Sequence, residues 1–188
     1  MNGKAIIFSA PSGAGKTTIV KYLLGCNLNL EFSVSACSRS SRGSEVNGKD
    51  YYFLSVEEFK NRIAKKDFLE WEEVYQDNYY GTLNSEIDRI WKNDHHVIFD
   101  VDVKGGLSLK KHFGKQALAI FVMPPSVNKL EERLRSRKTE TEESIKRRLA
   151  KANDELKYAP QFDFTLVNDD LETACQEAFE KVRQFLQS

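Results

Sequence analysis

The chain has 188 residues, enough for one compact domain with inserted subdomains, and its 28 Lys and Arg residues balance its 28 Asp and Glu residues. This zero net charge gives no reason to expect a non-specific grip on nucleic acid or a membrane surface, and no apolar run approaches membrane-spanning length. The three cysteines are odd in number and have no metal-ligand spacing, so we expect reduced thiols and a cytoplasmic protein.

Apolar runs alternate with helical patterns along the chain, which predicts an α/β fold with a parallel sheet. The strands are predicted, in chain order, at residues 5–9, 31–36, 97–103, 117–123 and 164–168. The helices are predicted at residues 16–24, after a Ser55–Glu58 capping box, around Ile87 and Ile90, across the charged stretch 126–158, and after residue 168. Polar, short-stranded sequence near 33–90 interrupts the alternation, so we interpret it as an inserted subdomain.

The stretch SAPSGAGKTT follows the first predicted strand and opens the first predicted helix. A strand, a glycine-rich turn, Lys-Thr and a helix in this order indicate a phosphate-binding loop. Gly13 and Gly15 allow the backbone to approach phosphate oxygens at the positive end of the helix. Lys16 can reach the β- and γ-phosphates, and the Thr17 hydroxyl can bind Mg²⁺. The motif departs from its usual form at Ala10, which replaces the first glycine. We predict a nucleoside triphosphate site.

A loop in the inserted region suggests what accepts the phosphate. Arg39 and Arg42 lie three residues apart in a polar, glycine-containing stretch, with Tyr51 nearby. Two guanidinium groups and a phenol suit a dianionic phosphate, although a solvated loop explains the same residues. On this pattern alone, water and a hydroxyl or phosphate acceptor both remain open.

The strand predicted at 97–103 carries Asp100 and Asp102 two residues apart. Both side chains are therefore expected to point to one face at the carboxyl end of the strand, where α/β folds bind ligands, although capping or salt-bridging aspartates would explain the same residues. In the segment FLEWEE, by contrast, Glu72 and Glu73 fit the description of ordinary exposed acids.

The chain resembles the guanylate kinase family from end to end. The resemblance lies in six segments that follow the family's order: SAPSGAGKTT, FSVSACSRSSRGSEVNGKDYYF, FLEWEEVYQDNYYGT, IFDVDVKGG, PPSVNKLEERLRSRKTETEESIKRRL and LVNDDL. It implies ATP-dependent, Mg²⁺-assisted transfer of phosphate to GMP and dGMP. It also implies three parts of an α/β fold: a P-loop kinase core with a parallel sheet flanked by helices (1–32, 95–124 and 160–188), an inserted mixed GMP-binding subdomain (33–94) and a helical lid (about 125–159).

The resemblance further implies roles for individual residues. The residues expected to bind ATP are Ser12, Gly13, Ala14, Gly15, Lys16, Thr17, Thr18 and Asn168, the last of them near the adenine. The residues expected to bind GMP are Arg39, Arg42, Tyr51 and Tyr80 at the phosphate, with Glu45 supporting the arginines, and Ser35, Glu70, Thr82 and Asp102 around the base. The residues expected to act in phosphoryl transfer are Lys16, Arg39, Asp100, Arg133, Arg137 and Arg148, with Asp100 near the metal and the acceptor and Thr17 on the metal.

Some points stay open. Arg147 stands next to Arg148, so the last lid assignment is uncertain by one residue, and the other lid charges are expected at the surface. An acceptor such as AMP or dTMP is one alternative. Glu70 argues against it, because one carboxylate can accept both the N1–H and the N2–H₂ of guanine.

Two further alternatives are a non-catalytic guanylate-kinase-like interaction module and a GTPase switch. Such modules have typically lost a working phosphate loop, whereas Lys16 and Thr17 are present, and no guanine-reading NKxD stretch occurs in the sequence. The sequence leaves the oligomeric state open.

Overall fold

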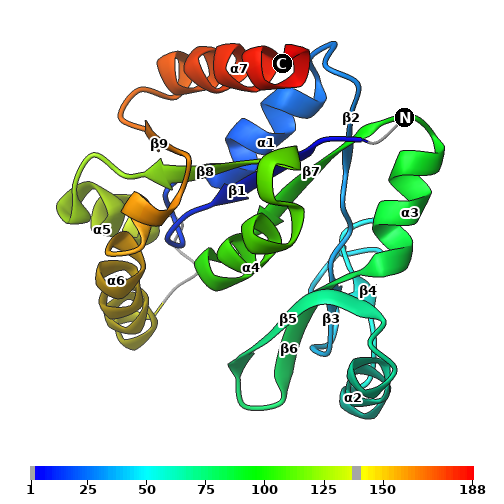
Figure 1. The fold of residues 1–188 in the computed structure, drawn as a ribbon. Helices are drawn as coiled ribbons and strands as arrows, with labels where there is room; N and C mark the ends of the chain where they lie inside the picture. The colour runs from blue at the N-terminus through cyan, green and yellow to red at the C-terminus, as the bar shows by residue number, and fades with distance from the viewer. Residues whose placement is uncertain (1–2, 137–140) are drawn as a thin grey trace.

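The computed structural model describes residues 3–136 and 141–188. Its strands are β1 (Ala5–Ser9), β2 (Leu30–Phe32), β3 (Ala36–Cys37), β4 (Tyr52–Phe53), β5 (Phe68–Tyr75), β6 (Asn78–Leu83), β7 (His96–Val101), β8 (Ala117–Met123) and β9 (Phe164–Val167). Its helices are α1 (Lys16–Leu24), α2 (Val56–Ala64), α3 (Asn84–Lys92), α4 (Val103–Phe113), α5 (Val127–Ser136), α6 (Glu142–Leu156) and α7 (Leu171–Gln187), with short 3-10 turns at Gly114–Gln116 and Ala159–Gln161. Figure 1 shows their arrangement.

The core of the molecule is a five-stranded sheet in the order β2-β7-β1-β8-β9, and its recorded pairings are all parallel. Alternate residues of each central strand face opposite sides of this sheet. Ile6 and Phe8 of β1 pack with α1 and α7 on one face, and Ala5 and Ile7 pack with α3 and α4 on the other. Helices therefore cover both faces, as the prediction of an α/β fold with a flanked parallel sheet requires.

A second, mixed sheet in the order β4-β3-β6-β5 lies between β2 and α3 in the sequence. It carries its own small core around Phe59 of α2, whose first turn is capped by the Ser55 side chain as predicted. The single strand predicted at 31–36 is wrong: Leu30–Phe32 joins the core sheet and Ala36–Cys37 joins the mixed sheet. Residues 33–35 thus form the connection between the two sheets.

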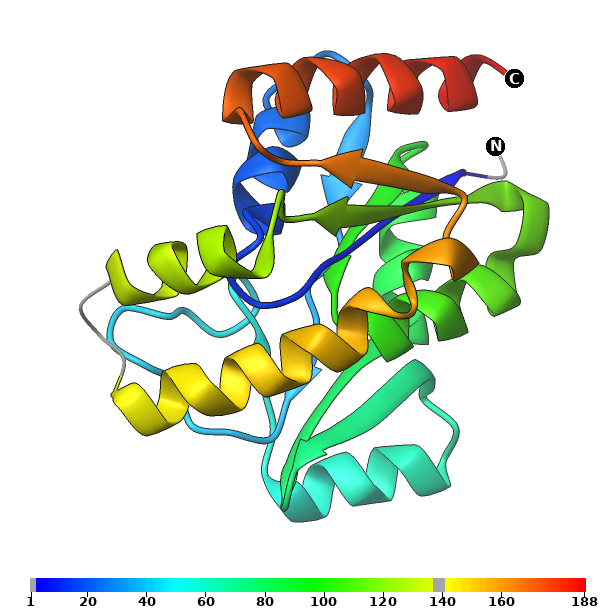
Figure 2. The same cartoon turned by 90° about the vertical axis from the view of Figure 1, so that its left-hand side faces the viewer.

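Helices α5 and α6 follow β8 and lie beside the loop between β1 and α1, as both views of the ribbon show (Figures 1 and 2). They pack on each other through a small apolar cluster that includes Leu130, Leu134 and Ile145. A Cβ atom added to Gly13 would lie 3.0 Å from the side chains of Leu130 and Leu134. The helical pair therefore lies directly against the glycine-rich loop.

The strand predicted at 97–103 is two residues too long. Strand β7 ends at Val101, and Asp102 is the N-cap of α4, where its carboxylate accepts a hydrogen bond from the Gly105 amide at 2.7 Å. The prediction that Asp100 and Asp102 alternate along one strand is therefore wrong. Among the described residues, no helix is both long and apolar enough to cross a membrane.

Candidate active site

One cavity of about 460 Å³ opens where the core, the mixed sheet and α6 meet. It brings together most of the residues predicted from the sequence. The predicted residues that line it are Ser12, Gly13, Ala14, Gly15, Lys16, Thr17, Thr18, Ser35, Arg42, Tyr51, Glu70, Tyr80, Asp100, Asp102 and Arg148. Five other predicted residues stand outside this lining, namely Arg39, Glu45, Thr82, Arg133 and Asn168, and Arg137 lies outside the described residues.

The loop between β1 and α1 is shaped by its two glycines. Gly13 and Gly15 have φ angles of 100° and 95°, a region that side chains with a Cβ rarely adopt. Gly15 is also the N-cap of α1 and offers no side-chain hydrogen bond to the helix. The first residues of α1, Lys16, Thr17 and Thr18, line the cavity, so the positive end of the helix dipole lies beside it, which suits an anion.

Asp100 at the end of β7 joins two residues of this loop. Its Oδ1 lies 2.6 Å from Lys16 Nζ, and its Oδ2 accepts a hydrogen bond from the Thr17 hydroxyl at 2.6 Å. Lys16 also donates to the carbonyl oxygen of Val101. A cation, a hydroxyl and a carboxylate thus meet at the carboxyl end of the central strands, where α/β folds bind ligands.

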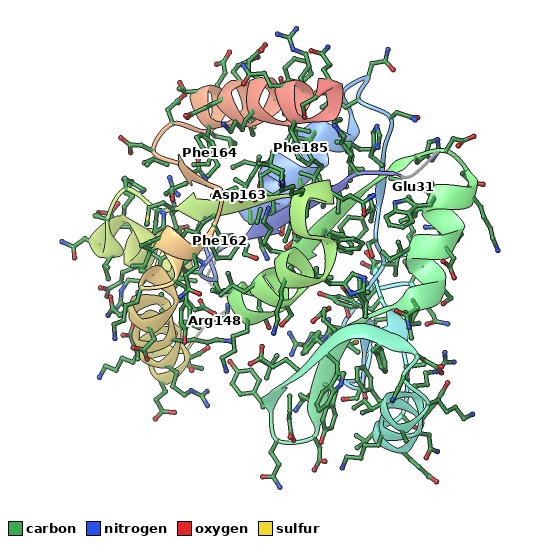
Figure 3. All side chains as sticks on the ribbon, viewed as in Figure 1. Glu31, Arg148, Phe162, Asp163, Phe164 and Phe185 are labelled. Atoms are coloured by element: carbon green, nitrogen blue, oxygen red, sulfur yellow. The ribbon has the colours of Figure 1, made fainter. Side chains whose placement is uncertain are left out.

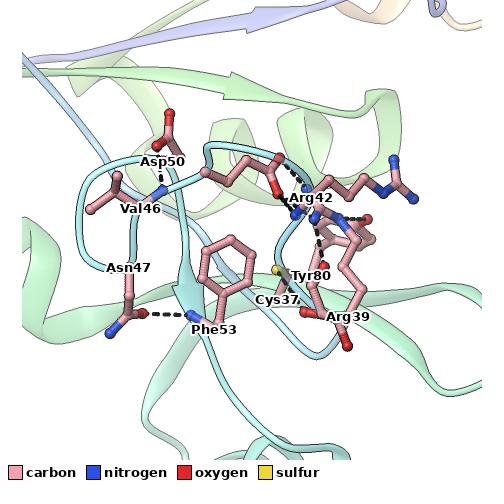
Figure 4. A network of polar contacts seen from close by, with 10 residues as sticks. Cys37, Arg39, Arg42, Val46, Asn47, Asp50, Phe53 and Tyr80 are labelled. Atoms are coloured by element: carbon pink, nitrogen blue, oxygen red, sulfur yellow. Dashed lines mark hydrogen bonds and ion pairs between the residues drawn. The ribbon is translucent and has the colours of Figure 1, made fainter. Parts of the chain in front are cut away.

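Arg39 lies behind the cavity wall at the centre of a polar network (Figure 4). Its guanidinium donates to both carboxylate oxygens of Glu45 at 2.7 and 2.8 Å and to the Tyr80 hydroxyl at 3.1 Å, and it stacks on the Tyr51 ring at 4.9 Å. The Arg39 hydrogen bonds lower the pKa of Glu45 to about 2. The Arg42 side chain extends away from this network in Figure 4 and lines the cavity.

Glu70 of β5 presents a second carboxylate to the cavity. The Thr82 hydroxyl, which is fully buried, donates to its Oε1 at 2.7 Å. Burial raises the pKa of Glu70 to about 7, against the opposing effect of the Thr82 hydrogen bond. Its Oε2 faces Gly105, where an added Cβ atom would lie 3.1 Å away. Thr82 therefore holds Glu70 rather than lining the cavity itself.

Arg148 reaches from α6 to the phosphate loop, where its Nη1 donates to the Ser12 hydroxyl at 2.6 Å. Figure 3 shows its side chain directed from the helix toward the centre of the molecule, whereas Arg147 is exposed. Of these two neighbours, Arg148 is the one that lines the cavity. Arg133 of α5 instead donates to the carbonyl oxygens of Asn168 and Asp169, at 2.9 and 3.3 Å.

Sequence reasoning missed three charged residues of the cavity lining: Glu72, Lys151 and Glu155. The expectation that Glu72 is an ordinary exposed acid is wrong, because it is half-buried and pairs with Lys104 at 2.9 Å. The expectation that the remaining lid charges stay at the surface is wrong for Glu155, whose pKa burial raises. The spacing of these residues could have predicted their position. Glu72 follows Glu70 by two residues in a strand and Glu155 follows Arg148 by seven in a helix, and both spacings place the two side chains on the same face.

A parallel sheet whose first strand leads into a phosphate loop, with an inserted mixed sheet and a helical lid meeting at one cavity, defines a P-loop kinase fold. The family model described as guanylate kinase matches residues 2–187. The guanylate kinase of Bacteroides thetaiotaomicron is 53% identical over 186 residues, covering 99% of this chain and 91% of that protein. The chain belongs to the guanylate kinase family.

Two other proteins agree with this membership. The guanylate kinase of Porphyromonas gingivalis is 53% identical over 184 residues, covering 97% of this chain and 98% of that protein. The crystal structure of guanylate kinase from Anaplasma phagocytophilum superposes with a TM-score of 0.79 at 27% identity, covering 99% of this chain and 87% of that one. The resemblance stated from the sequence is confirmed.

Proposed function

We propose that this protein transfers the γ-phosphoryl group of ATP to GMP, and to dGMP, yielding ADP and the nucleoside diphosphate. The observation that carries this proposal is the shared cavity, which is lined both by the loop between β1 and α1 and by Glu70, Arg42 and Tyr51 of the inserted region. Phosphoryl transfer asks a protein mainly for positioning and charge neutralisation, and these residues can supply both.

On the donor side, the phosphate loop binds the ATP phosphates through its backbone amides. Lys16, which pairs with Asp100 and lines the cavity, moves to the β- and γ-phosphate oxygens and neutralises charge on the migrating group. Arg148 approaches the same phosphates from the lid, and Arg133 and Arg137 act from α5 and the segment that follows it. Asn168 positions the loop on the donor side.

The donor set also suits Mg²⁺. This ion prefers oxygen ligands and keeps several waters, so one or two protein oxygens together with substrate phosphates suffice. The Thr17 hydroxyl and the Asp100 carboxylate, which are 2.6 Å apart at the mouth of the loop, meet this requirement. When bound, the ion would supply positive charge that offsets the negative charge of the substrate phosphates. Thr17 would hold it directly, and Asp100 would orient the Thr17 hydroxyl.

On the acceptor side, the GMP phosphate binds against Arg42, Tyr51 and Tyr80, with Arg39 just behind them. Glu45 holds Arg39 in place through its bidentate contact, so the guanidinium is positioned before substrate arrives. The negative end of GMP is thereby aimed at the phosphate loop across the cavity.

At the other end of the acceptor, Glu70 reads the guanine base. Its carboxylate accepts the N1–H and the N2–H₂ together, whereas adenine presents a bare ring nitrogen at that edge and no amine beside it. Ser35 and Asp102 complete this end, and Thr82 orients Glu70 through its hydroxyl. A buried polar group left unpaired makes such a site selective.

A coupled assay of ADP release tests the proposal. The purified protein is given ATP and magnesium with GMP, dGMP, AMP, dTMP or no acceptor. We expect turnover with GMP and dGMP and little with the others. Release of ADP at the same rate without any acceptor would identify an ATPase, and a preference for AMP or dTMP would assign a different monophosphate kinase.

A further inference from the structure

We infer that Glu86, which does not line the cavity, is a positioning residue that fixes the base-binding and phosphate-binding halves of the acceptor site relative to each other. This inference rests on the proposed function. Glu86 is the third residue of α3, in its first turn, and its side chain is only 2% exposed. A buried carboxylate is costly unless it is paired and fully hydrogen-bonded, so its partners are informative.

Four hydrogen bonds converge on Glu86, two at each oxygen. Oε1 accepts from the Val34 amide at 2.9 Å and from Arg89 Nη2 at 2.8 Å. Oε2 accepts from the Tyr52 hydroxyl at 3.0 Å and from Arg89 Nε at 3.1 Å. Two of these donors thus come from the neighbouring helical turn, and the other two come from separate segments of the connection and the mixed sheet.

Val34 and Tyr52 are each next to a residue that lines the cavity. Val34 precedes Ser35 at the base end, and Tyr52 follows Tyr51 at the phosphate end. The Tyr52 amide also donates to the Ser35 carbonyl oxygen at 2.9 Å. The Glu86 carboxylate therefore holds the Val34 backbone, next to Ser35, and the Tyr52 side chain, next to Tyr51. The hydrogen bond between Tyr52 and Ser35 joins the two segments directly.

The same carboxylate is tied to the core sheet through Arg89. The Arg89 Nη1 donates to Glu31 of β2, and Glu31 Oε2 lies 2.6 Å from His95 Nδ1. Figure 3 shows Glu31 beside α3. The positions of Ser35 and Tyr51 are thus fixed relative to β2 and α3, the elements that precede and follow the inserted mixed sheet in the sequence.

This arrangement acts on one substrate more than on the other. Ser35 and Tyr51 belong to the acceptor half of the cavity, whereas the donor half is built by the loop between β1 and α1 and by α6. Loss of the Glu86 carboxylate should therefore loosen GMP binding and leave ATP binding largely intact. A general loss of stability would weaken both.

The test replaces Glu86 with Gln and measures the Kd of GMP and of ATP separately by calorimetry, with thermal unfolding as the check on folding. A glutamine side chain has one acceptor oxygen, and its amide group faces a donor. We expect the Kd of GMP to rise about tenfold and that of ATP to change by less than about twofold. Asp88→Asn on the exposed face of α3 is the matched control and should change neither.

Tyr52→Phe removes a single hydrogen bond and keeps the carboxylate, so it decides the matter if Glu86→Gln does not fold. We expect a rise of about threefold in the Kd of GMP alone. An unchanged Kd of GMP in a folded variant, or an equal rise for both nucleotides, overturns the positioning role. Failure of the unmodified protein to bind GMP would instead overturn the proposed function, and the two results are distinguishable.

Discussion

The side-chain amide of Asn168 donates a hydrogen bond to the carbonyl oxygen of Ala14, with 2.7 Å between nitrogen and oxygen. Both residues are buried, and a Cβ atom added to Gly15 would lie 2.2 Å from the same amide nitrogen. The backbone carbonyl of Asn168 meanwhile accepts from Arg133 of α5. The residue that follows β9 therefore supports the loop between β1 and α1 with its side chain and Arg133 of α5 with its backbone.

Asn168→Ala should impair the donor site. It leaves the Ala14 carbonyl unpaired in a buried position and removes the support of the loop, so we expect the KM for ATP to rise about tenfold and the KM for GMP to stay within about twofold. Steady-state kinetics with each substrate varied in turn measure this. The exposed Asn128 on α5 offers a matched control, because Asn128→Ala removes the same amide from the surface.

A second donor separates the two roles open to Asn168. If its side chain acts through the loop, Asn168→Ala should lower kcat/KM by the same factor with ATP and with GTP as donor. A loss confined to ATP would show instead that the side chain reads the adenine, as the sequence resemblance implies.

Lys16→Ala should abolish turnover while the fold persists. The variant lacks the ammonium group that neutralises the charge developing on the migrating phosphoryl group. We therefore expect kcat to fall by about a thousandfold or more. Rapid quench of radiolabelled ATP measures the remaining rate, and circular dichroism checks the fold. Lys21 lies exposed on the same helix, so Lys21→Ala should keep the original kcat. A folded Lys16→Ala enzyme with normal turnover would rule out the phosphate-loop function.

Binding of GMP should weaken as the pH falls. Burial raises the pKa of Glu70 to about 7, and only the ionised carboxylate can accept two hydrogen bonds from guanine. Lowering the pH through about 7 protonates the group in the free protein. We therefore expect the Kd of GMP to rise roughly tenfold between about pH 8 and pH 6. Calorimetric titration at several pH values measures it.

Glu70→Gln is the control for that pH dependence, because the GMP phosphate also titrates near pH 6. The variant should bind GMP weakly at every pH and keep only the shallower change due to the ligand. If it shows the same slope as the unmodified protein, the dependence does not arise from Glu70, and its assignment to the base fails.

Arg148→Ala should slow phosphoryl transfer far more than Arg147→Ala. Arg148 contacts the Ser12 hydroxyl and lines the cavity, whereas Arg147 points to solvent one residue earlier on α6. Removal of a positively charged side chain that contacts the transferring phosphoryl group lowers kcat by about a hundredfold or more. Single-turnover measurements on the two variants make a matched pair, and similar rates would mean that the lid arginine acts elsewhere.

Local features of this protein were predictable from the sequence alone. Strand β1, the glycine-rich loop and α1 follow one another within a short stretch. The Ser55 hydroxyl accepts its hydrogen bond from the amide of Glu58, only three residues further on. Backbone preferences and short-range hydrogen bonds decide such features, so their residues carry the signal wherever the chain goes. The six segments that resemble the guanylate kinase family, in their order along the chain, were sufficient to identify the family.

Contacts between distant segments were decided by the tertiary structure. The pairs Asn168–Ala14 and Glu86–Val34 are separated by 154 and 52 residues. The predicted strand 31–36 likewise divides between two sheets, although its alternation is continuous. A period of two or of 3.6 shows which side of an element a residue occupies, but it does not identify the partner on that side. The partner depends on how whole elements pack, because that packing determines which buried donors and acceptors can meet.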